Sequence, residues 1–129
     1  MNIIDPYLIT LDKKINQLKK GTFISIEYFD FDFEIKRIFF IYDFNDNPLE
    51  NIRGGHGHYN ANQILINLNE YVEIDIQNNN GTKNTFILDS PDKALVFPKN
   101  NKLVMKNFSS NAILLVLCDK NFKDDKVYE

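Results

Sequence analysis

The sequence predicts an all-β protein, either a sandwich or a small barrel. Short runs of β-branched and aromatic residues recur along most of the chain, and turn signals separate them about every 8 to 12 residues. The 129 residues suffice for one domain, which we place at residues 1–129. Hydrophobic residues make up 43% of the chain and charged residues 26%, a composition typical of folded proteins that excludes a disordered chain.

The N-terminal region is expected to differ from the rest. Leu11, Ile15 and Leu18 have helical spacing and Thr10 could cap them, so a short helix is predicted over residues 11–18, with an irregular strand as the alternative. The following segments are predicted to be strands: 23–29, 34–43, 63–68, 71–76, 84–88, 94–97, 102–105 and 112–117. Turn signals separate them at 45–48, 78–81, 90–91, 98–101 and 109–111.

The charged residues 119–126 near the C-terminus are expected on the surface, with Asp124 and Asp125 forming a solvated pair. The formal charge of −3 offers no basic surplus for nucleic acid or an anionic membrane. Cys118 follows an apolar run and is interpreted as a buried core residue. Neither a signal peptide nor a stretch of about 20 apolar residues is visible, so a cytoplasmic location is expected.

The segment Arg53-Gly-Gly-His-Gly-His58 is the candidate functional motif of the sequence. It holds the 2 histidines of the chain, His56 and His58. On an extended segment these side chains point to the same face, because strand side chains alternate. The glycines Gly54 and Gly55 allow the backbone to turn or to approach a ligand closely.

The motif has a non-functional interpretation, two exposed histidines on a glycine loop, and two functional interpretations. His-x-His in a β-barrel is similar to the first metal-binding motif of cupins, but Gln63 stands at the glutamate position and a third histidine is absent. A site with two histidines would need a carboxylate as well, and no motif singles out Glu70 or Glu73 for that role. We therefore expect no catalytic metal and no cofactor. The second interpretation is acid–base chemistry, in which two imidazoles move a proton between adjacent carbons.

These blocks resemble a known family, the dTDP-4-keto-6-deoxyglucose 3,4-ketoisomerases, which are WxcM-like cupins. The matching segments are 20–23, 26–27, 35–43, 53–58 with Gln63, 89–91 and 107–110. The resemblance extends over about residues 10 to 126. It implies a small cupin (jelly-roll) barrel with an N-terminal arm, an extended rather than helical segment 11–18, and a homodimer with a swapped N-terminal strand. It also implies a dTDP-linked 4-keto-6-deoxy sugar as substrate and a product that feeds a 3-amino-sugar pathway.

Residue by residue, the resemblance makes His58 the base that abstracts the proton and His56 its partner at the neighbouring carbon. It makes Arg53 and Arg37 ligands of the nucleotide or diphosphate, and Gln63 a contact of a sugar hydroxyl. Several family residues are replaced. One residue of an aromatic pair is usually tyrosine in the family, but both are phenylalanine here, Phe39 and Phe40. Tyr59 stands in place of a lysine, Lys102 and Leu103 in place of a Trp-His pair, and Gly57 in place of an alanine.

These replacements leave alternatives open. Tyr42 or Tyr59 could supply the missing phenol. The chain could instead be a sugar-nucleotide binding module without activity, a nucleotide-sugar 3,5-epimerase, or a metal-dependent oxygenase of the cupin class.

Overall fold

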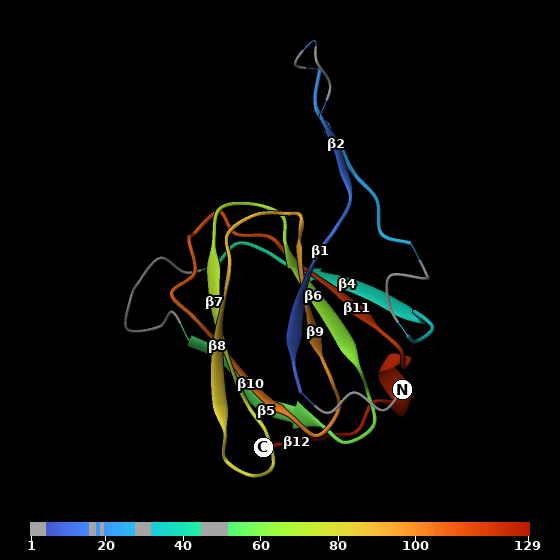
Figure 1. Cartoon of the computed structure of the whole chain (residues 1–129). Helices are drawn as coiled ribbons and strands as arrows, with labels where there is room; N and C mark the ends of the chain where they lie inside the picture. Colours follow the sequence, from blue (N-terminus) through green and yellow to red (C-terminus); the bar gives the residue numbers. More distant parts are fainter. Residues whose placement is uncertain (1–4, 16–17, 19, 28–31, 45–51) are drawn as a thin grey trace.

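Two five-stranded antiparallel sheets face each other and form a jelly-roll barrel, as expected (Figure 1). The computed structural model describes residues 5–15, 18, 20–27, 32–44 and 52–129, and only the backbone at 52–54. The first sheet has the order β1-β9-β6-β11-β4, and its strands are β1 (Tyr7–Thr10), β9 (Lys93–Phe97), β6 (Gln63–Asn67), β11 (Leu114–Cys118) and β4 (Arg37–Ile41). The second sheet has the order β12-β5-β10-β7-β8, and its strands are β12 (Val127–Tyr128), β5 (Ile52–His58), β10 (Lys102–Lys106), β7 (Val72–Gln77) and β8 (Lys83–Leu88).

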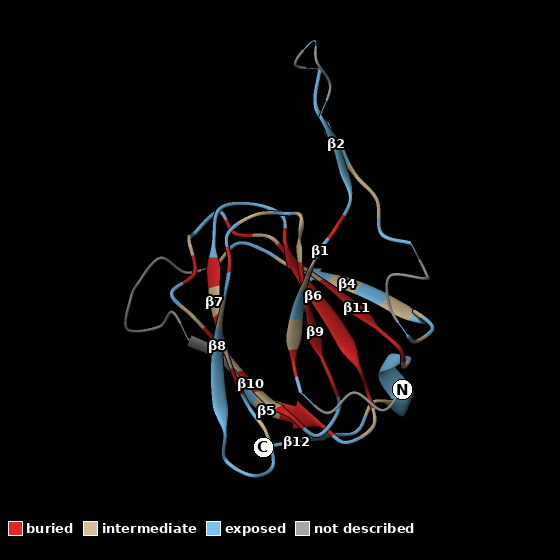
Figure 2. Cartoon of the chain, viewed as in Figure 1, coloured by how far each residue is buried: buried red, intermediate tan, exposed pale blue. Residues whose placement is uncertain are grey.

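The core explains why the central strands of the first sheet are mostly apolar. Along β6 every residue is buried, because its alternate side chains enter two different clusters. Leu65 packs inside the barrel, whereas Ile64 and Ile66 pack on the outer face of the first sheet. Figure 2 shows the resulting buried band along β6, β9 and β11. Cys118 ends β11 as a buried free thiol, as predicted.

The predicted helix over residues 11–18 is wrong. Lys13–Ile15 form β2, which pairs with β3 (Thr22–Ile24) in a hairpin that projects from the barrel (Figure 1). Leu11 is buried in the outer cluster, but Ile15 and Leu18 are exposed. Helical spacing therefore gains no packing here, and cross-strand hydrogen bonds satisfy the backbone instead.

The predicted strands from 34 onward are present with shifted ends. The expected strand 23–29 is confirmed only at its start, and residues 28–29 lie outside the described part, as does the turn at 45–48. The turn at 78–81 is confirmed, since Gly81 has φ 89° and its N–H donates to Asn78 O at 3.1 Å. Across the described residues, no helix is long and apolar enough to cross a membrane.

An ion pair on the outer face of the second sheet makes stability depend on pH. Lys106 Nζ lies 2.8 Å from Asp75 Oδ2, and Thr85 Oγ1 donates to Asp75 Oδ1 at 2.6 Å. Partial burial alone would raise the pKa of Asp75, but these two hydrogen bonds outweigh it and lower the pKa. The carboxylate therefore stabilises the fold above the unfolded pKa of 3.8, and this contribution is lost as the pH falls through the lower folded value.

We expect Asp75→Asn to lower the free energy of unfolding at pH 7 by about 1 kcal/mol or less, because solvent screens the pair. The difference from wild type should shrink as the pH falls below the ordinary aspartate pKa. Urea unfolding at neutral pH and at about pH 3 measures it. A difference that grows on acidification would contradict this assignment.

Candidate functional site

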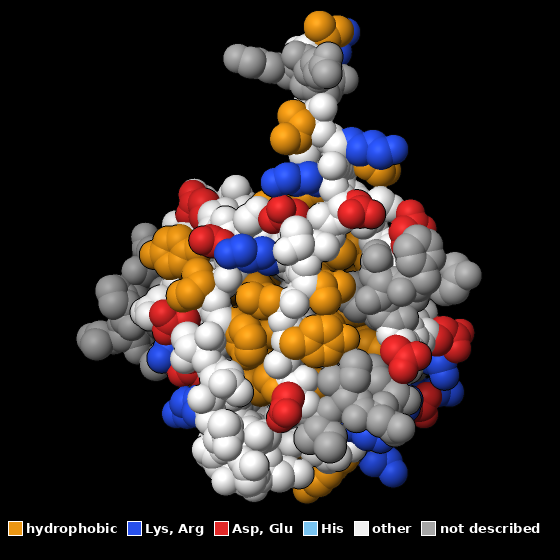
Figure 3. Space-filling view, in the orientation of Figure 1, with side chains coloured by type: hydrophobic (Ala, Val, Ile, Leu, Met, Phe, Trp, Pro, Cys, Tyr) orange, Lys and Arg blue, Asp and Glu red, His pale blue; other side chains and the backbone are white. Residues whose placement is uncertain are grey.

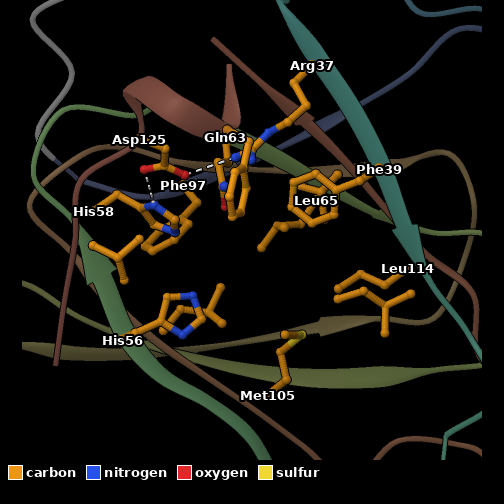
Figure 4. Close-up of a pocket in the computed structure, with 15 residues that line it drawn as sticks. Arg37, Phe39, His56, His58, Gln63, Leu65, Phe97, Met105, Leu114 and Asp125 are labelled. Atoms are coloured by element: carbon orange, nitrogen blue, oxygen red, sulfur yellow. Dashed lines mark hydrogen bonds and ion pairs between the residues drawn. The ribbon is translucent and has the colours of Figure 1, made fainter. Parts of the chain in front are cut away.

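Strand β5 places both histidines on the inner face of the barrel. His56 and His58 point to the same side, as predicted, and their ring centroids are 5.3 Å apart. Both line a cavity of about 430 Å³ between the two sheets (Figure 4). His58 is only 5% exposed, and its ring meets the Phe97 ring edge-on at 5.9 Å. The predicted catalytic pair thus shares one wall of one cavity.

The cavity is apolar except for one group of polar side chains. Figure 4 shows Arg37, Gln63, His58 and Asp125 close together, with His56 further along the same wall. The remaining lining is hydrocarbon from both sheets and from the C-terminal segment, namely Phe39, Ile41, Leu65, Phe97, Leu103, Met105, Leu114, Val116, Phe122 and Val127. A site of this size and polarity suits a small ring with a few hydroxyl groups.

Asp125 connects His58 with Arg37, although the charged sequence around it suggested a solvated side chain. Its side chain is 5% exposed, so the expectation of a solvated Asp124–Asp125 pair is wrong at this residue. Oδ1 lies 2.7 Å from His58 Nδ1, and Oδ2 accepts a hydrogen bond of 2.9 Å from Arg37 Nη2. An ionised carboxylate here accepts a hydrogen bond from a protonated Nδ1, and in that tautomer of a neutral ring Nε2 carries the lone pair.

Arg37 occupies the start of β4 beside this carboxylate. Its guanidinium also lies over the rings of Phe39 and Phe122, at 5.0 and 5.6 Å. Burial alone would lower the pKa of Arg37, but contacts with Cys118 Sγ and Asp125 outweigh that effect and raise it. Nε is buried and has no hydrogen-bond partner within the described part of the chain.

The C-terminal segment brings Asp125 to the cavity. After the 3-10 turn Phe122–Asp124, strand β12 pairs with β5 and places Val127 opposite His58. Asn60 fixes the turn from both sides: Nδ2 donates to Asp124 O at 2.8 Å, and Oδ1 accepts from Lys126 N at 3.0 Å. Backbone pairing with the histidine strand is therefore what positions this carboxylate.

Gly57 allows that pairing. A methyl group on Gly57 would lie 2.7 Å from the backbone oxygen of Asn101 and 2.5 Å from Tyr128 Cζ. A glycine at position 57 is thus required by the packing of β12 against β5. We expect Gly57→Ala to lower the free energy of unfolding by about 1–3 kcal/mol through overpacking. Urea unfolding measures the loss, and a stability equal to that of wild type would contradict the close approach.

The other predicted ligand residues differ in how far the structure describes them. Gln63 is buried in β6 and lines the cavity, with Nε2 3.8 Å from Cys118 Sγ. Gly55 has φ 81° and lies where β5 and β10 shift register, which is a β-bulge, and Gly54 precedes it opposite Val104. Both glycines shape the strand; their contact with a ligand stays a prediction. The Arg53 side chain lies outside the described residues.

Neither tyrosine considered as a replacement phenol reaches the cavity. Tyr42 points outward from the edge of the first sheet, and Tyr59 is exposed with its ring against Tyr128. Phe39 lines the cavity whereas Phe40 is exposed on the opposite face of β4. Within the described lining there is thus no phenol to assist the two imidazoles.

The carboxylates considered as metal ligands lie elsewhere. Glu73 pairs with Lys106 on the outer face of the second sheet, and Glu70 accepts a hydrogen bond from Asn111. In the described ranges, no group of three histidine, cysteine, aspartate or glutamate side chains is arranged to hold a metal ion.

Sequence reasoning missed two residues of this site, Asp125 and Phe122. Residues 119–126 were expected on the surface, and residues 121–124 and 126 are exposed. Asp119 and the Asp125 side chain are buried instead, and Asp119 accepts hydrogen bonds from Asn62. The many charged residues of this segment suggested exposure and gave no indication of a buried carboxylate. The apolar and aromatic pair Val127-Tyr128 that follows could have predicted a strand returning to the barrel.

Known proteins resemble this chain in sequence and in fold. Residues 5–129 match the family model described as FdtA, WxcM-like, C-terminal. A 3,4-ketoisomerase from Helicobacter canadensis is 32% identical with a TM-score of 0.82, and the match covers 96% of this chain and 91% of that one. WlaRA, a TDP-fucose-3,4-ketoisomerase from Campylobacter jejuni, is 33% identical with a TM-score of 0.79 over 98% and 89% of the two chains.

Two further structures and one negative result complete the comparison. QdtA, a sugar 3,4-ketoisomerase from Thermoanaerobacterium thermosaccharolyticum solved with TDP, is 26% identical with a TM-score of 0.82 over 95% and 85% of the two chains. The RmlC epimerase of Mycobacterium tuberculosis shares the fold, at 11% identity and a TM-score of 0.76 over 95% and 66%. Curated protein sequences give no significant match. The chain therefore belongs to the FdtA family of WxcM-like proteins and is an isomerase.

Proposed function

We propose that the protein moves the keto group of a dTDP-linked 4-keto-6-deoxyhexose from C4 to C3. The observation that carries this proposal is His58, whose Nδ1 is held by Asp125 and whose other nitrogen is left to act beside His56 in the cavity. The named activities of the Helicobacter and Campylobacter relatives and the TDP bound to QdtA support the reaction and the nucleotide.

The reaction needs one proton to leave C3 and another to reach C4. His58 Nε2 takes the C3 proton while the C4 carbonyl oxygen gains a proton, which gives an enediol. Protonation at C4 and loss of the proton from the C3 oxygen then give the 3-keto sugar. Imidazole suits both directions because it titrates near neutral pH. His56 is assigned to the proton at the neighbouring carbon.

The remaining polar groups are assigned to binding. Arg37 lines the cavity, and its positive charge is assigned to stabilising negative charge that develops on the enediol or lies on the diphosphate. Gln63 is assigned to a sugar hydroxyl and Arg53 to the diphosphate. The 3-keto product is proposed to feed a cytoplasmic pathway to a 3-amino sugar.

A homodimer is part of this proposal. Ile38 and Phe40, on one face of the edge strand β4, and Tyr42, just after that strand, are each more than 60% exposed. The projecting hairpin also carries exposed apolar side chains, Ile15 and Phe23 among them. Figure 3 shows orange, hydrophobic atoms along this arm. A second copy would cover both surfaces. Light scattering should give twice the monomer mass, and Phe40→Lys should shift it toward the monomer.

A coupled assay tests the function. The protein is incubated with dTDP-4-keto-6-deoxyglucose and a 3-aminotransferase with its amino donor, and the expected product is a dTDP-linked 3-amino sugar. Absence of this product, in conditions where a known ketoisomerase yields it, would overturn the proposal. Calorimetric binding of dTDP without turnover would instead favour a binding module.

A further inference from the structure

Asp125 lies between two short elements and belongs to neither. The 3-10 turn ends before it, at Asp124, and β12 begins after it, at Val127. Its backbone is extended, with φ −84° and ψ 115°, and its own N–H makes one hydrogen bond of 3.3 Å to Phe122 O. The direction in which the Asp125 side chain leaves the backbone therefore depends on what holds the peptide units around it.

The side chain of Asn60 holds the backbone on both sides of Asp125. Its Nδ2 donates to the carbonyl oxygen of Asp124 at 2.8 Å, and its Oδ1 accepts from the N–H of Lys126 at 3.0 Å. These two groups belong to the two peptide units that meet at Asp125. Because each peptide unit is planar, a side chain that fixes both planes fixes φ and ψ of the residue between them.

Asn60 is itself attached to a fixed part of the barrel. It belongs to the connection 59–62 between β5 and β6. Two residues further along this connection, Asn62 donates from its backbone N–H and from Nδ2 to the two carboxylate oxygens of Asp119, at 2.8 and 2.9 Å. Both partners of that pair are buried. The connection thus holds the C-terminal segment at its start through Asn62 and around Asp125 through Asn60.

The pair of hydrogen bonds made by Asn60 requires an amide. A carbonyl oxygen only accepts and a backbone N–H only donates, so the side chain between them must do both. Aspartate could accept from Lys126 N–H but could not donate to Asp124 O. Alanine would leave both groups to water and would free both peptide units.

We propose that Asn60 is a positioning residue of this isomerase, which fixes the backbone at Asp125 and thereby aims its carboxylate at His58 and Arg37. The contacts that depend on it are those of 2.7 Å to His58 Nδ1 and 2.9 Å from Arg37 Nη2, drawn as dashed lines in Figure 4. Asn60 is not among the described residues that line the cavity, so its effect reaches the site through Asp125. The kinetic consequence rests on the proposed function, whereas the effect on the imidazole does not.

Nitrogen NMR of the ¹⁵N-labelled histidines in Asn60→Ala tests the proposal, at a pH where the His58 ring is neutral. Without the two hydrogen bonds the backbone at Asp125 can rotate, and the carboxylate leaves Nδ1. The proton position on an imidazole follows the hydrogen bond that its nitrogens make. We expect the fraction of His58 that carries its proton on Nδ1 to fall and the Nε2–H tautomer to rise. In the coupled assay we expect kcat to fall by about 10- to 100-fold, since small misplacements at a site have effects of this size.

Two further variants separate positioning from a general loss of stability. Asn69→Ala is the matched control, because Asn69 Nδ2 also connects two loops, through a hydrogen bond of 2.9 Å to Asn111 O, and lies outside the described cavity lining. We expect the wild-type tautomer and kcat from it. Asn60→Asp keeps the acceptor for Lys126 N–H and loses the donor, so it should fall between wild type and Asn60→Ala. Melting temperatures check that each variant is folded.

The outcomes distinguish this inference from the proposed function. The same His58 tautomer in wild type and in Asn60→Ala would overturn the positioning role, and so would an equal change in Asn69→Ala. A tautomer that changes only with Asn60, in a protein whose wild type forms no product in the coupled assay, would support the positioning role and overturn the proposed function.

Discussion

Replacing His58 by asparagine should lower kcat by about 100- to 10,000-fold, the range expected when a general base is lost. Asparagine is close to histidine in size and keeps a polar group near Asp125, so the barrel should fold. It cannot accept a proton from carbon at neutral pH. We expect a large effect because Asp125 would prepare His58 Nε2 as the base, and Asp125, the one carboxylate among the described lining residues, is already paired with Arg37.

Steady-state kinetics with the coupled aminotransferase assay measures this loss, and the melting temperature checks the fold. His56→Asn is a useful comparison on the same wall, because the two variants separate abstraction at C3 from transfer at the neighbouring carbon. A His58→Asn enzyme with wild-type kcat would refute the role of His58.

Asp125→Asn is expected to have the second largest effect, a decrease in kcat of about 100-fold or more. An amide can donate to Nδ1, which would move the imidazole proton to Nε2 and leave no lone pair toward the substrate. Asp125 is a positioning residue, since its oxygens contact His58 and Arg37. Asp124→Asn is the matched control, because that neighbouring side chain is exposed and should leave kcat unchanged.

A spectroscopic measurement distinguishes positioning from a general loss of structure. The chain has 2 histidines, so selective ¹⁵N labelling gives a simple spectrum in which the tautomer of His58 can be read. At a pH where the ring is neutral, wild type should carry the proton on Nδ1 and Asp125→Asn on Nε2. The same tautomer in both proteins would show that Asp125 does not set the proton position.

Much of the fold follows from local sequence signals. The alternation along 71–76 predicted a strand with one buried face, and β7 lies in the second sheet in that way. The apolar run 63–68 predicted a strand buried on both faces, and β6 lies so in the first sheet. The error at residues 11–18 has a physical cause. Three apolar residues do not determine whether the backbone forms hydrogen bonds within a helix or with a neighbouring strand. Leu11 is buried while Ile15 and Leu18 are exposed.

Alternation along one strand predicted that the two histidines share a face, and the family resemblance pointed to Arg37 and Gln63. His56 and His58 lie on one face because of period-two alternation, and Gln63 and Arg37 line the same cavity. Asp125 could not be predicted this way, because its role depends on a contact 67 residues along the chain from His58. Only the pairing of β12 with β5 places that charge beside the imidazole.

The central claim is that His58 and His56 move the keto group without inverting another centre, and one NMR measurement in ²H₂O tests it directly. With dTDP-4-keto-6-deoxyglucose, the predicted result is a keto carbon that moves from C4 to C3 while C5 keeps its hydrogen. A keto group that stays at C4, with deuterium entering at C5 and inversion there, would show epimerisation and contradict the account.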